Sequence, residues 1–319
     1  MKRECFVGID TSNYTTSAAV CDCDGVVVAN LKRPLPVPEG GRGLRQSDAV
    51  FAHVKNLPGL MSELGEVLAE YEPIAVGYSA TPRDAEGSYM PCFLTGEVAA
   101  RSFAAGLGIP TYAFSHQNGH IRAAAYSSGA EKELLGGEFC AFHVSGGTTE
   151  ILHVRPTGVG FDVELVGGTK DINAGQAIDR AGVALGLKFP CGPALEALAL
   201  ENKERFPTPK ISVSGLECNL SGLENLSLKL WRETQNAELC AAYVLDFVGK
   251  TLRALSKNLR EIYPDLPILY AGGVMSNSII KNMLSPLGNV CFAQPAFSAD
   301  NAAGVALLCR DAHDARELN

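Results

Sequence analysis

A pattern that occurs twice along this chain constrains its fold more than any other feature. Within the first 35 residues, β-branched and apolar runs alternate with short stretches rich in Gly, Asp and Asn, which predicts three strands in an antiparallel meander. The same succession of buried strand, small polar turn and second strand returns in residues 139–169, and aligning the two copies places Ser12 on Ser145. A period of this length does not suit a solenoid. It predicts two homologous lobes, each opening with a three-stranded meander.

Strands alternate with helices through the rest of the chain. The helices are expected near residues 46–70, 94–107, 175–186, 192–203 and 237–261, with a last helix from Asp300. Further strands are expected in the apolar runs IAVGYS, TYAF, PILYAGG and NVCFAQ. This alternation indicates α/β lobes with mixed sheets. Composition shifts at SSGAEKELLGG, so we expect an N-terminal lobe over 1–130 and a C-terminal lobe with a helical insertion over 131–319.

Composition and charge narrow the classes of protein that this chain can represent. Its 319 residues, 46 % of them hydrophobic, suffice for two lobes with cores of their own. Lysine and arginine total 27 against 35 acidic residues, a net charge of −8, so the chain lacks the basic footprint of a dedicated nucleic-acid binder. Contact with RNA through a local patch or a partner stays open.

The cysteines and the apolar runs indicate the cellular compartment in which we expect the chain. Ten cysteines are scattered without a CxxC or zinc-ribbon spacing, and most fall in apolar stretches where cysteine behaves as a small core residue. We therefore expect a reducing cytoplasm. No apolar run approaches ~20 residues, so no transmembrane helix and no membrane partner are expected. The apolar part of MKRECFVGID is too short for a signal peptide and predicts a first strand.

Three turns at strand ends are rich in Gly, Ser and Thr: DTSNYTT (10–16), VSGGTT (144–149) and AGGVMSN (271–277). Such turns expose backbone N–H groups that can surround phosphate oxygens, and glycine permits close approach. Two of them occupy equivalent points of the repeat, so we expect a phosphate-bearing ligand between the lobes, with ordinary hairpin turns as the alternative. No Rossmann or Walker motif occurs in a suitable context. The turn residues expected to hold the ligand are Ser145, Gly146, Gly147, Gly272, Gly273 and Asn277.

Two histidines raise the question of a metal site. In FSHQNGHIRAAAYS, His116 and His120 lie four residues apart at the start of a predicted helix that Ser115 can cap, so both imidazoles share one helical face. Asp300 is a plausible third ligand, and two histidines with one carboxylate suit zinc or ferrous iron. The alternatives are structural histidines and Asp300 as the N-cap of the last helix. The residue after His116 is Gln117, so the glutamate of zinc-protease motifs is missing.

Seven motifs together resemble a known family. DTSNYTT, HQNGH, SGGTT, DINAGQAIDR…CGP, SVSGLEC, AGGVMSN and SADNAAG occur in the order of the family pattern ETSCDET, HxEGH, SGGHT, DDAAGEAFDK…GGP, SFSGLKT, AGGVAAN and TDNAAM. The pattern is that of the catalytic subunit of the tRNA threonylcarbamoyladenosine synthase, formerly called O-sialoglycoprotein endopeptidase. The resemblance covers nearly the whole chain, and the ordered set is far more specific than any one motif.

The resemblance implies a two-lobed actin-like or sugar-kinase-like fold (a duplicated ribonuclease H-like fold) with a nucleotide in the cleft between the lobes. It implies transfer of a threonylcarbamoyl group from its adenylate onto N6 of a tRNA adenosine. The cofactors implied are a divalent metal, iron or zinc, and an ATP- or AMP-type nucleotide or acyl-adenylate. The implied metal ligands are His116, His120 and Asp300. The implied adenosine-side residues are Asp179, Gly192, Glu196 and Asn277, and the residues expected at the reacting centre are Asp10, Ser12 and Thr148.

Local sequence leaves two of these assignments open. Asp179, at a predicted helix start, could accept hydrogen bonds from a ribose, or it could be a helix-surface or capping carboxylate. Asp10, at the end of the first strand, could contact magnesium through water, which is a hypothesis that nucleotide affinity of Asp10→Asn with and without magnesium would test.

The chain departs from the family pattern at several polar positions. The acidic pair after the first strand is Tyr14-Thr15, the glutamate between the histidines is Asn118, and a "GPG" stretch is replaced by residues 80–96. Further departures are Thr148, Ile172, Gln176 and Glu217, and the additions Arg83, Asp84 and Glu86. The metal ligands and nucleotide turns stay while acid–base and substrate groups change. This fits a paralogue with the same platform and a different acceptor.

Three hypotheses follow from the residues and the resemblance. The first is a metal- and nucleotide-dependent threonylcarbamoyl or carbamoyl transferase acting on tRNA. The second is carbamoyl transfer, or other nucleotide-dependent chemistry, on a small molecule. The third is a catalytically weak scaffold subunit that binds a nucleotide and a protein partner. A partner subunit or a homodimer is expected under each of the three hypotheses.

Overall fold

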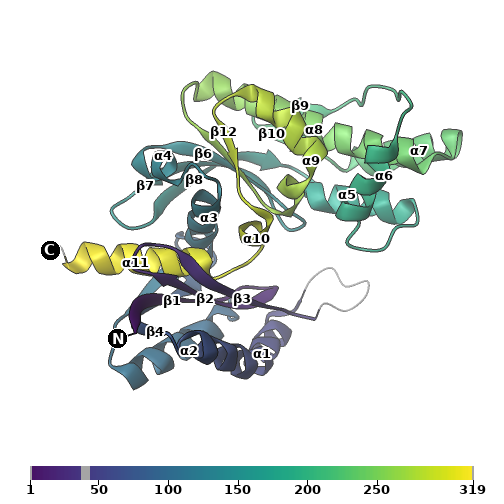
Figure 1. The fold of residues 1–319 in the computed structure, drawn as a ribbon. Helices are drawn as coiled ribbons and strands as arrows, with labels where there is room; N and C mark the ends of the chain where they lie inside the picture. Colours follow the sequence, from purple (N-terminus) through teal and green to yellow (C-terminus); the bar gives the residue numbers. More distant parts are fainter. Residues whose placement is uncertain (1, 37–43, 318–319) are drawn as a thin grey trace. The chain divides into compact units, whose positions relative to one another are not determined.

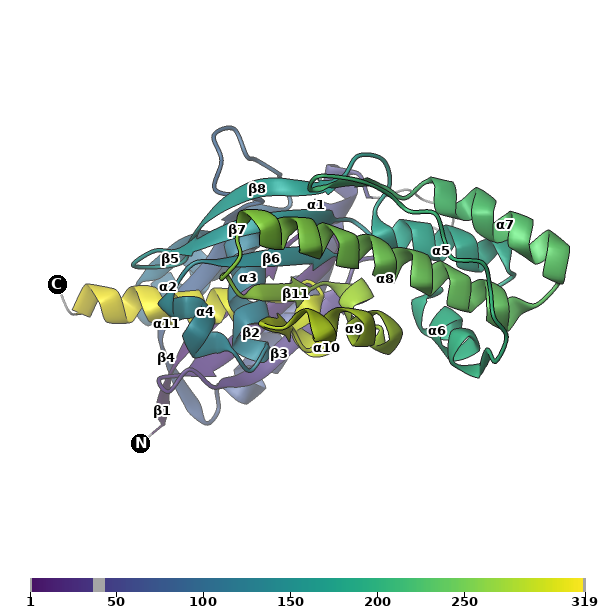
Figure 2. The ribbon, with the colours of Figure 1, turned by 90° about the horizontal axis from the view of Figure 1, so that it is seen from above.

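The meander predicted at the N-terminus opens the first of two α/β units. The computed structural model describes residues 2–36 and 44–317. Packing divides the chain into unit 1, formed by Met1–Ser127, Pro156–Asp162 and Ala299–Asn319, and unit 2, formed by Ser128–Arg155 and Val163–Ser298. Figures 1 and 2 show the elements of the two units.

Unit 1 holds a five-stranded sheet in the order β3-β2-β1-β4-β5. Its strands are β1 (Arg3–Thr11), β2 (Thr15–Asp22), β3 (Val27–Pro34), β4 (Tyr71–Thr81) and β5 (Thr111–Ser115). The first three pair antiparallel, which confirms the predicted meander, and β4 and β5 continue the sheet parallel to β1. The helices are α1 (Gln46–Val67), α2 (Phe93–Leu107), α3 (His116–Ser127) and α11 (Ala303–Glu317).

The two faces of this sheet carry different partners. Val7, Ile9 and Leu31 join the apolar cluster beneath α1 and α2, which line one face in Figure 1. Residues of the opposite parity face α11. A Cβ at Gly8 would lie 2.4 Å from the backbone nitrogen of Ala306, so glycine at this position lets α11 lie directly on β1.

Unit 2 repeats this topology and adds to it. Its strands are β6 (Phe139–Val144), β7 (Thr149–Pro156), β8 (Phe161–Thr169), β9 (Ser212–Ser214), β10 (Glu217–Asn219), β11 (Ile268–Ala271) and β12 (Val290–Phe292). The order β12-β11-β6-β7-β8-β10-β9 contains the same arrangement as unit 1, with β6 in the place of β1 and parallel β11 and β12 in the places of β4 and β5. The short hairpin β9–β10 extends the β8 edge.

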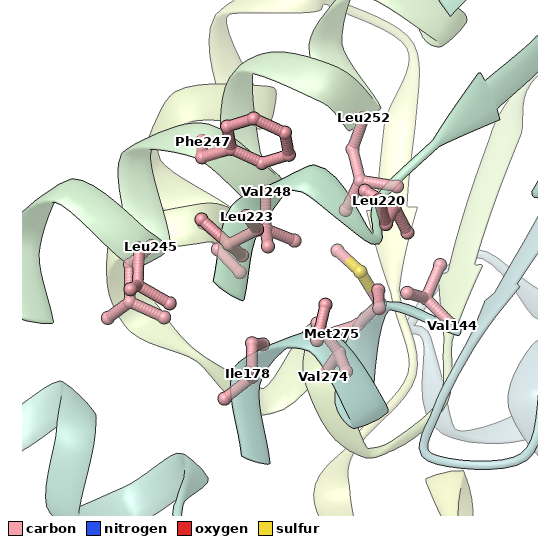
Figure 3. Close-up of a cluster of buried hydrophobic side chains, with 14 of the residues drawn as sticks. Val144, Ile178, Leu220, Leu223, Leu245, Phe247, Val248, Leu252, Val274 and Met275 are labelled. Atoms are coloured by element: carbon pink, nitrogen blue, oxygen red, sulfur yellow. The ribbon is translucent and has the colours of Figure 1, made fainter. Parts of the chain in front are cut away.

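Helices cover the sheet of unit 2. They are α4 (Glu131–Gly136), α5 (Ala174–Ala184), α6 (Gly192–Glu201), α7 (Gly222–Thr234), α8 (Ala237–Ile262), α9 (Ser278–Leu284), α10 (Pro295–Ser298) and the 3₁₀ turns η1 (Gly273–Ser276) and η2 (Ser285–Leu287). The long α8, seen lengthwise in Figure 2, packs against α6, α7 and α9. Figure 3 shows its Phe247, Val248 and Leu252 converging with Val144 and Met275. Burying each such side chain contributes about 1.5–3 kcal/mol.

Two sequence expectations differ from the structure. The last helix begins at Ala303, not at Asp300. It packs on β1, β2 and β4, so residues from Ala299 onward belong to unit 1, whereas the predicted range 131–319 assigned them to the second lobe. Within the described residues, no helix is both long enough and apolar enough to cross a bilayer.

Candidate functional site

Three predicted metal ligands meet in unit 1. His116 and His120 stand in the first turns of α3, and Asp300 lies in the segment that leads into α11. Nε2 of His120 is 2.9 Å from Nε2 of His116 and 3.1 Å from Oδ1 of Asp300, and Nε2 of His116 is 3.8 Å from the same oxygen. The four-residue spacing on one helix therefore brings both rings to a single carboxylate, as predicted.

The donor set fits a divalent metal ion. Metal–ligand bonds of about 2.1 Å separate neighbouring ligand atoms by about 3.0 Å at octahedral and about 3.4 Å at tetrahedral angles. The three observed separations between ligand atoms are 2.9, 3.1 and 3.8 Å, a range that includes both values. Two imidazoles and one carboxylate are a donor set suited to zinc or ferrous iron, with positions left for substrate. Among the described residues, these three alone form a group of metal-binding type.

A buried carboxylate orients the first histidine. Oδ2 of Asp10 accepts a hydrogen bond from Nδ1 of His116 at 2.7 Å and one from the hydroxyl of Ser79, while Oδ1 accepts the backbone N–H of Ser12 at 3.1 Å. With its proton on Nδ1, His116 directs the Nε2 lone pair at the ligand position, which is the arrangement that carboxylates impose on metal-binding histidines. Both oxygens of Asp10 are thus engaged within the protein, and a magnesium contact there stays a prediction.

The charges of this cluster shift one another. Burial would lower the pKa of His116, but Asp10 and Asp300 outweigh it and raise that pKa to about 9. Burial opposes ionisation of Asp10 as well, yet His116 and the Ser79 hydroxyl hold the pKa of this carboxyl below its usual value. Burial likewise opposes ionisation of Asp300, and its hydrogen bonds and the charges of the two histidines keep its pKa low. Both carboxyls are therefore ionised at neutral pH.

Ser12, predicted at the reacting centre, contacts the metal cluster. Its hydroxyl donates to Oδ2 of Asp300 at 2.9 Å. Its carbonyl lies 2.8 Å from Nε2 of His53, a fully buried histidine of α1 whose Nδ1 is 2.8 Å from Oγ1 of Thr16. A carbonyl only accepts, so Nε2 of His53 carries the proton and Nδ1 accepts from Thr16. Burial lowers the pKa of His53, which keeps the ring neutral.

Sequence reasoning missed His53. No motif marks it, and its one signal is a histidine on the apolar side of a helix that carries the buried Leu60 and Leu64. The hydrogen bonds give it the role of holding the backbone of Ser12 in place.

The alternative role of Asp300 as a helix cap does not hold. The helix begins three residues later, and the backbone N–H of Ala303 donates to the Asn301 side chain at 3.0 Å. The carboxylate of Asp300 instead contacts His120 and the hydroxyl of Ser12. The proposed cap of α3 is present, because the N–H of Asn118 donates to the Ser115 hydroxyl at 3.2 Å.

Asn118, the residue that replaces the family's glutamate, has a structural task. It lies two residues from His116, about 200° around the helix. Its Oδ1 accepts the N–H of Phe161 at 2.6 Å and its Nδ2 donates to the carbonyl of the same residue at 3.2 Å. Nδ2 also contacts Ser115 at 3.2 Å and Asp84. An amide satisfies both groups of one peptide, whereas a carboxylate could not donate to the carbonyl. Asn118 therefore holds the β7–β8 tip through both groups of the Phe161 peptide.

The glycine turns of unit 2 divide into closely packed and open positions. Gly272 has φ +102°, and a Cβ there would lie 2.2 Å from the carbonyl oxygen of Val144, so the turn requires glycine to pack on β6. At Gly146, Gly147 and Gly273, in contrast, no described heavy atom outside the glycine's own local segment lies within 4 Å of such a Cβ. These three positions leave space where a ligand can approach the backbone.

Ser145 shapes the first of these turns. Its hydroxyl accepts the backbone N–H of Gly147 at 3.2 Å and of Thr148 at 3.1 Å. Thr148 borders a cavity of about 640 Å³ in unit 2. The cavity is lined by Gly147–Glu150, Leu165–Lys170, Asn173 and Ser214–Glu217. Glu217, the residue that replaces the family's lysine, pairs with Lys170 at 2.5 Å across this cavity wall.

Of the predicted adenosine-side residues, Gly192 and Asn277 lie at helix starts, whereas Glu196 lies within α6. Asp179 lies in the middle of α5 and not at a helix start as predicted, and its Oδ1 accepts the N–H of Cys191 at 2.7 Å, which holds the turn that leads into α6. Burial raises the pKa of Asp179. Glu196 accepts both the N–H and the hydroxyl of Ser278, at 2.7 and 2.5 Å.

Asn277 and Gln176 act as caps in the same way. Oδ1 of Asn277 accepts the N–H of Ile280 at 3.0 Å at the start of α9. Gln176 forms a capping box with Asn173, so the change from the family's glutamate keeps this contact. Glu196 and Asn277 are thus brought together at α9, and roles of these residues toward a nucleotide stay predictions.

Two units, each with a three-stranded meander continued by two parallel strands, define the actin-like and sugar-kinase-like class of α/β proteins, as the sequence predicted. Solved structures agree. Full-length HypF, in its phosphate- and nucleotide-bound form, matches with a TM-score of 0.59 at 13 % identity, over 98 % of this chain and 56 % of that chain. A ROK family glucokinase from Streptomyces griseus, in complex with glucose and AMPPNP, matches with a TM-score of 0.51 at 12 % identity, over 96 % of this chain and 99 % of that chain.

Sequence comparison is more specific than the fold. The family model of tRNA N6-adenosine threonylcarbamoyltransferase matches residues 48–307. A tRNA N6-adenosine threonylcarbamoyltransferase from Streptococcus suis (strain 05ZYH33) is 30 % identical over 298 residues, covering 89 % of this chain and 84 % of the relative. The chain therefore belongs to the tRNA N6-adenosine threonylcarbamoyltransferase family, and with it to the carbamoyltransferase enzymes.

Proposed function

We propose that this chain transfers the threonylcarbamoyl group from threonylcarbamoyl-adenylate to N6 of an adenosine in tRNA, with a divalent metal ion, iron or zinc, at His116, His120 and Asp300. One observation carries the proposal. The three ligand atoms converge in a chain of this family, and Asp10 holds His116 with Nε2 available. A scaffold subunit that had lost its chemistry would not need this orientation, which favours an enzyme.

The reaction is an acyl transfer. A bond forms between N6 of the acceptor and the carbamoyl carbon, the bond from that carbon to the phosphate oxygen breaks, AMP leaves, and the N6 amine loses a proton. A bound metal ion would supply Lewis acidity toward donor oxygens and a fixed template for them. Ser12 and Asp10 keep the Asp300 and His116 side chains in place, so little reorganisation is needed when the donor binds.

The open turns suit the anionic part of the donor. Gly146, Gly147 and Gly273 leave room beside their backbones, and successive N–H groups in such turns bind phosphate. We propose that they receive an ATP- or AMP-type nucleotide or the acyl-adenylate. N–H donors in these turns and the Thr148 hydroxyl would stabilise charge that develops on the carbamoyl oxygen.

A small-molecule acceptor is the second candidate. It is favoured by the net charge of −8 and by Glu217, which puts an acidic group on the cavity wall where the family pattern has a lysine. Phosphate-rich tRNA would then need a basic patch of this chain or a partner subunit. A partner subunit or a homodimer is part of the proposal in either case.

We propose a reducing, cytoplasmic setting for this activity. All ten cysteines lie in the described part of the chain and none of them forms a disulfide there. Eight of the thiols are buried, and free thiols are usual in a compartment that keeps them reduced.

Deletion of the gene, followed by measurement of threonylcarbamoyladenosine in bulk tRNA, tests the acceptor. A strong decrease that the wild-type gene restores and the His116→Ala gene does not would support the proposal. Unchanged levels in a host with no second synthase gene would contradict it, whereas unchanged levels beside a second synthase would favour the small-molecule acceptor. Metal analysis of the purified protein tests the ligands, because His116→Ala should lower the metal content and unchanged content would exclude the site.

A further inference from the structure

A lysine lies on the same face of the sheet as the metal cluster. In the antiparallel pairs of unit 1, Asp10 is opposite Ser17, and Ser17 is opposite Lys32. Residues directly opposite one another in antiparallel strands project to the same face. Lys32 of β3 is therefore in one row with Asp10, the residue that orients His116.

The contacts of Leu31 and Arg33, the neighbours of Lys32 in β3, independently show which face of the sheet Lys32 lies on. Leu31 packs into the apolar cluster beneath α1 and α2. Arg33 also points to that side and pairs with Glu63 of α1. Because side chains alternate along a strand, Lys32 faces the opposite side, where α11 and the preceding Asp300 lie. Lys32 is half-buried.

The charge of Lys32 reaches the cluster. Burial lowers the pKa of its ammonium, and the carboxylate of Asp300 opposes this, so the two groups interact electrostatically. With a divalent cation at the histidines, the charges of Asp10 and Asp300 are balanced, and Lys32 adds one positive charge beside them. A donor such as an acyl-adenylate carries anionic oxygens on its phosphate and, with a threonyl group, on its carboxylate.

We propose that Lys32 binds an anionic oxygen of the donor beside the metal cluster and so sets the specificity of this chain for its donor. This rests on the proposed function, because it assigns a residue to the same reaction. Lys32 contacts substrate at equal strength before and during the reaction, so its loss raises KM more than it lowers kcat. Arg33, one residue away with the same charge, contacts α1 and takes no part.

Two variants make the test specific. Lys32→Met and Arg33→Met remove the same charge from adjacent residues on opposite faces of β3, and Lys32→Arg restores it. We expect Lys32→Met to raise the donor KM about tenfold or more, as for loss of a hydrogen bond to a charged group, and Lys32→Arg to recover most of it. Arg33→Met should stay within about twofold of the wild type.

Two donors distinguish the sources of the anion. If Lys32 binds the threonyl carboxylate, Lys32→Met raises KM for threonylcarbamoyl-adenylate and leaves KM for carbamoyl-adenylate unchanged; if it binds the phosphate, both KM values rise. Equal effects of Lys32→Met and Arg33→Met, or unchanged KM for both donors, would overturn the proposal while the proposed function stands.

If the wild type transfers neither group, the proposed function itself is contradicted. The role of Lys32 can then still be tested by measuring binding. Calorimetric titration with AMP and with N-carbamoyl-L-threonine should then show weaker binding of one of them to Lys32→Met than to Arg33→Met. Equal binding of both probes to the two variants would overturn the role of Lys32 on its own.

Discussion

The role of Asn118 gives the sharpest structural prediction. Its side chain is 5 % exposed and makes two hydrogen bonds to one peptide group, that of Phe161, at 2.6 and 3.2 Å. Each such bond contributes about 1–2 kcal/mol when buried. Asn118→Ala should therefore lower the free energy of unfolding of unit 1 by about 2–4 kcal/mol.

Asn118→Asp separates the two halves of this contact. The variant keeps an acceptor for the N–H of Phe161 but sets a carboxylate against the Phe161 carbonyl and the carboxylate of Asp84. Nearby negative charge raises the pKa of a carboxyl, so the variant should be least stable at neutral pH and regain stability as the pH falls and the new group becomes protonated.

Urea unfolding and amide hydrogen exchange measure both effects. Protection of the Phe161 amide should fall in Asn118→Ala, while kcat below the unfolding transition should stay within about threefold, since Asn118 lies away from the histidine face. Loss of less than about 1 kcal/mol with unchanged exchange at Phe161, or a folded protein with abolished activity, would refute the structural reading.

Four further predictions concern the metal cluster and the glycine turns. His53→Gln keeps an amide nitrogen that can donate to the Ser12 carbonyl, whereas the side chain of His53→Asn is too short to reach it. In a chelator competition assay, the metal affinity of His53→Gln should therefore stay within about threefold of the wild type, and that of His53→Asn should be about tenfold lower. Because the pKa of His116 is raised to about 9 and metal binding must displace a proton, metal affinity should rise with pH toward 9 and then level off, with proton release measurable by calorimetry at pH 7. The same raised pKa stabilises the metal-free protein fully below pH 6.5, and this stabilisation is lost as the pH rises through about 9, which thermal unfolding against pH would detect. Gly272→Ala should destabilise unit 2 by about 2–3 kcal/mol while Gly273→Ala changes stability by less than about 0.5 kcal/mol, and equal effects in urea unfolding would contradict the packing argument.

Hydrophobic patterning sufficed to predict much of the fold. The repeated meander predicted both sheets, because hydrophobic alternation and turn residues are local signals. The alignment of Ser12 with Ser145 correctly matched β1 with β6. The unit that receives the last helix was not predictable in this way. Its place depends on contact with Gly8 at a separation of about 300 residues, and one sequence carries no signal for such a contact.

The candidate site was predictable where spacing along one element decides the geometry. His116 and His120 needed only the helical step, and Asp300 was predicted as the third ligand from its local sequence and again from the ordered family pattern. The contact of Asn118 with Phe161 was not predictable, because the two residues lie 43 positions apart and the sequence shows no link between them. His53 was missed for the same reason, since the Ser12 carbonyl that it contacts is a backbone group.

Transfer by the purified chain tests the central claim most directly. The protein, loaded with iron or zinc, is incubated with threonylcarbamoyl-adenylate and unmodified tRNA, and the nucleosides are measured by mass spectrometry beside the Streptococcus suis relative. We predict threonylcarbamoyladenosine from the wild type and at least about a hundredfold less from His116→Ala. Absence of product from the wild type while the relative is active, or equal product from His116→Ala, would contradict the account.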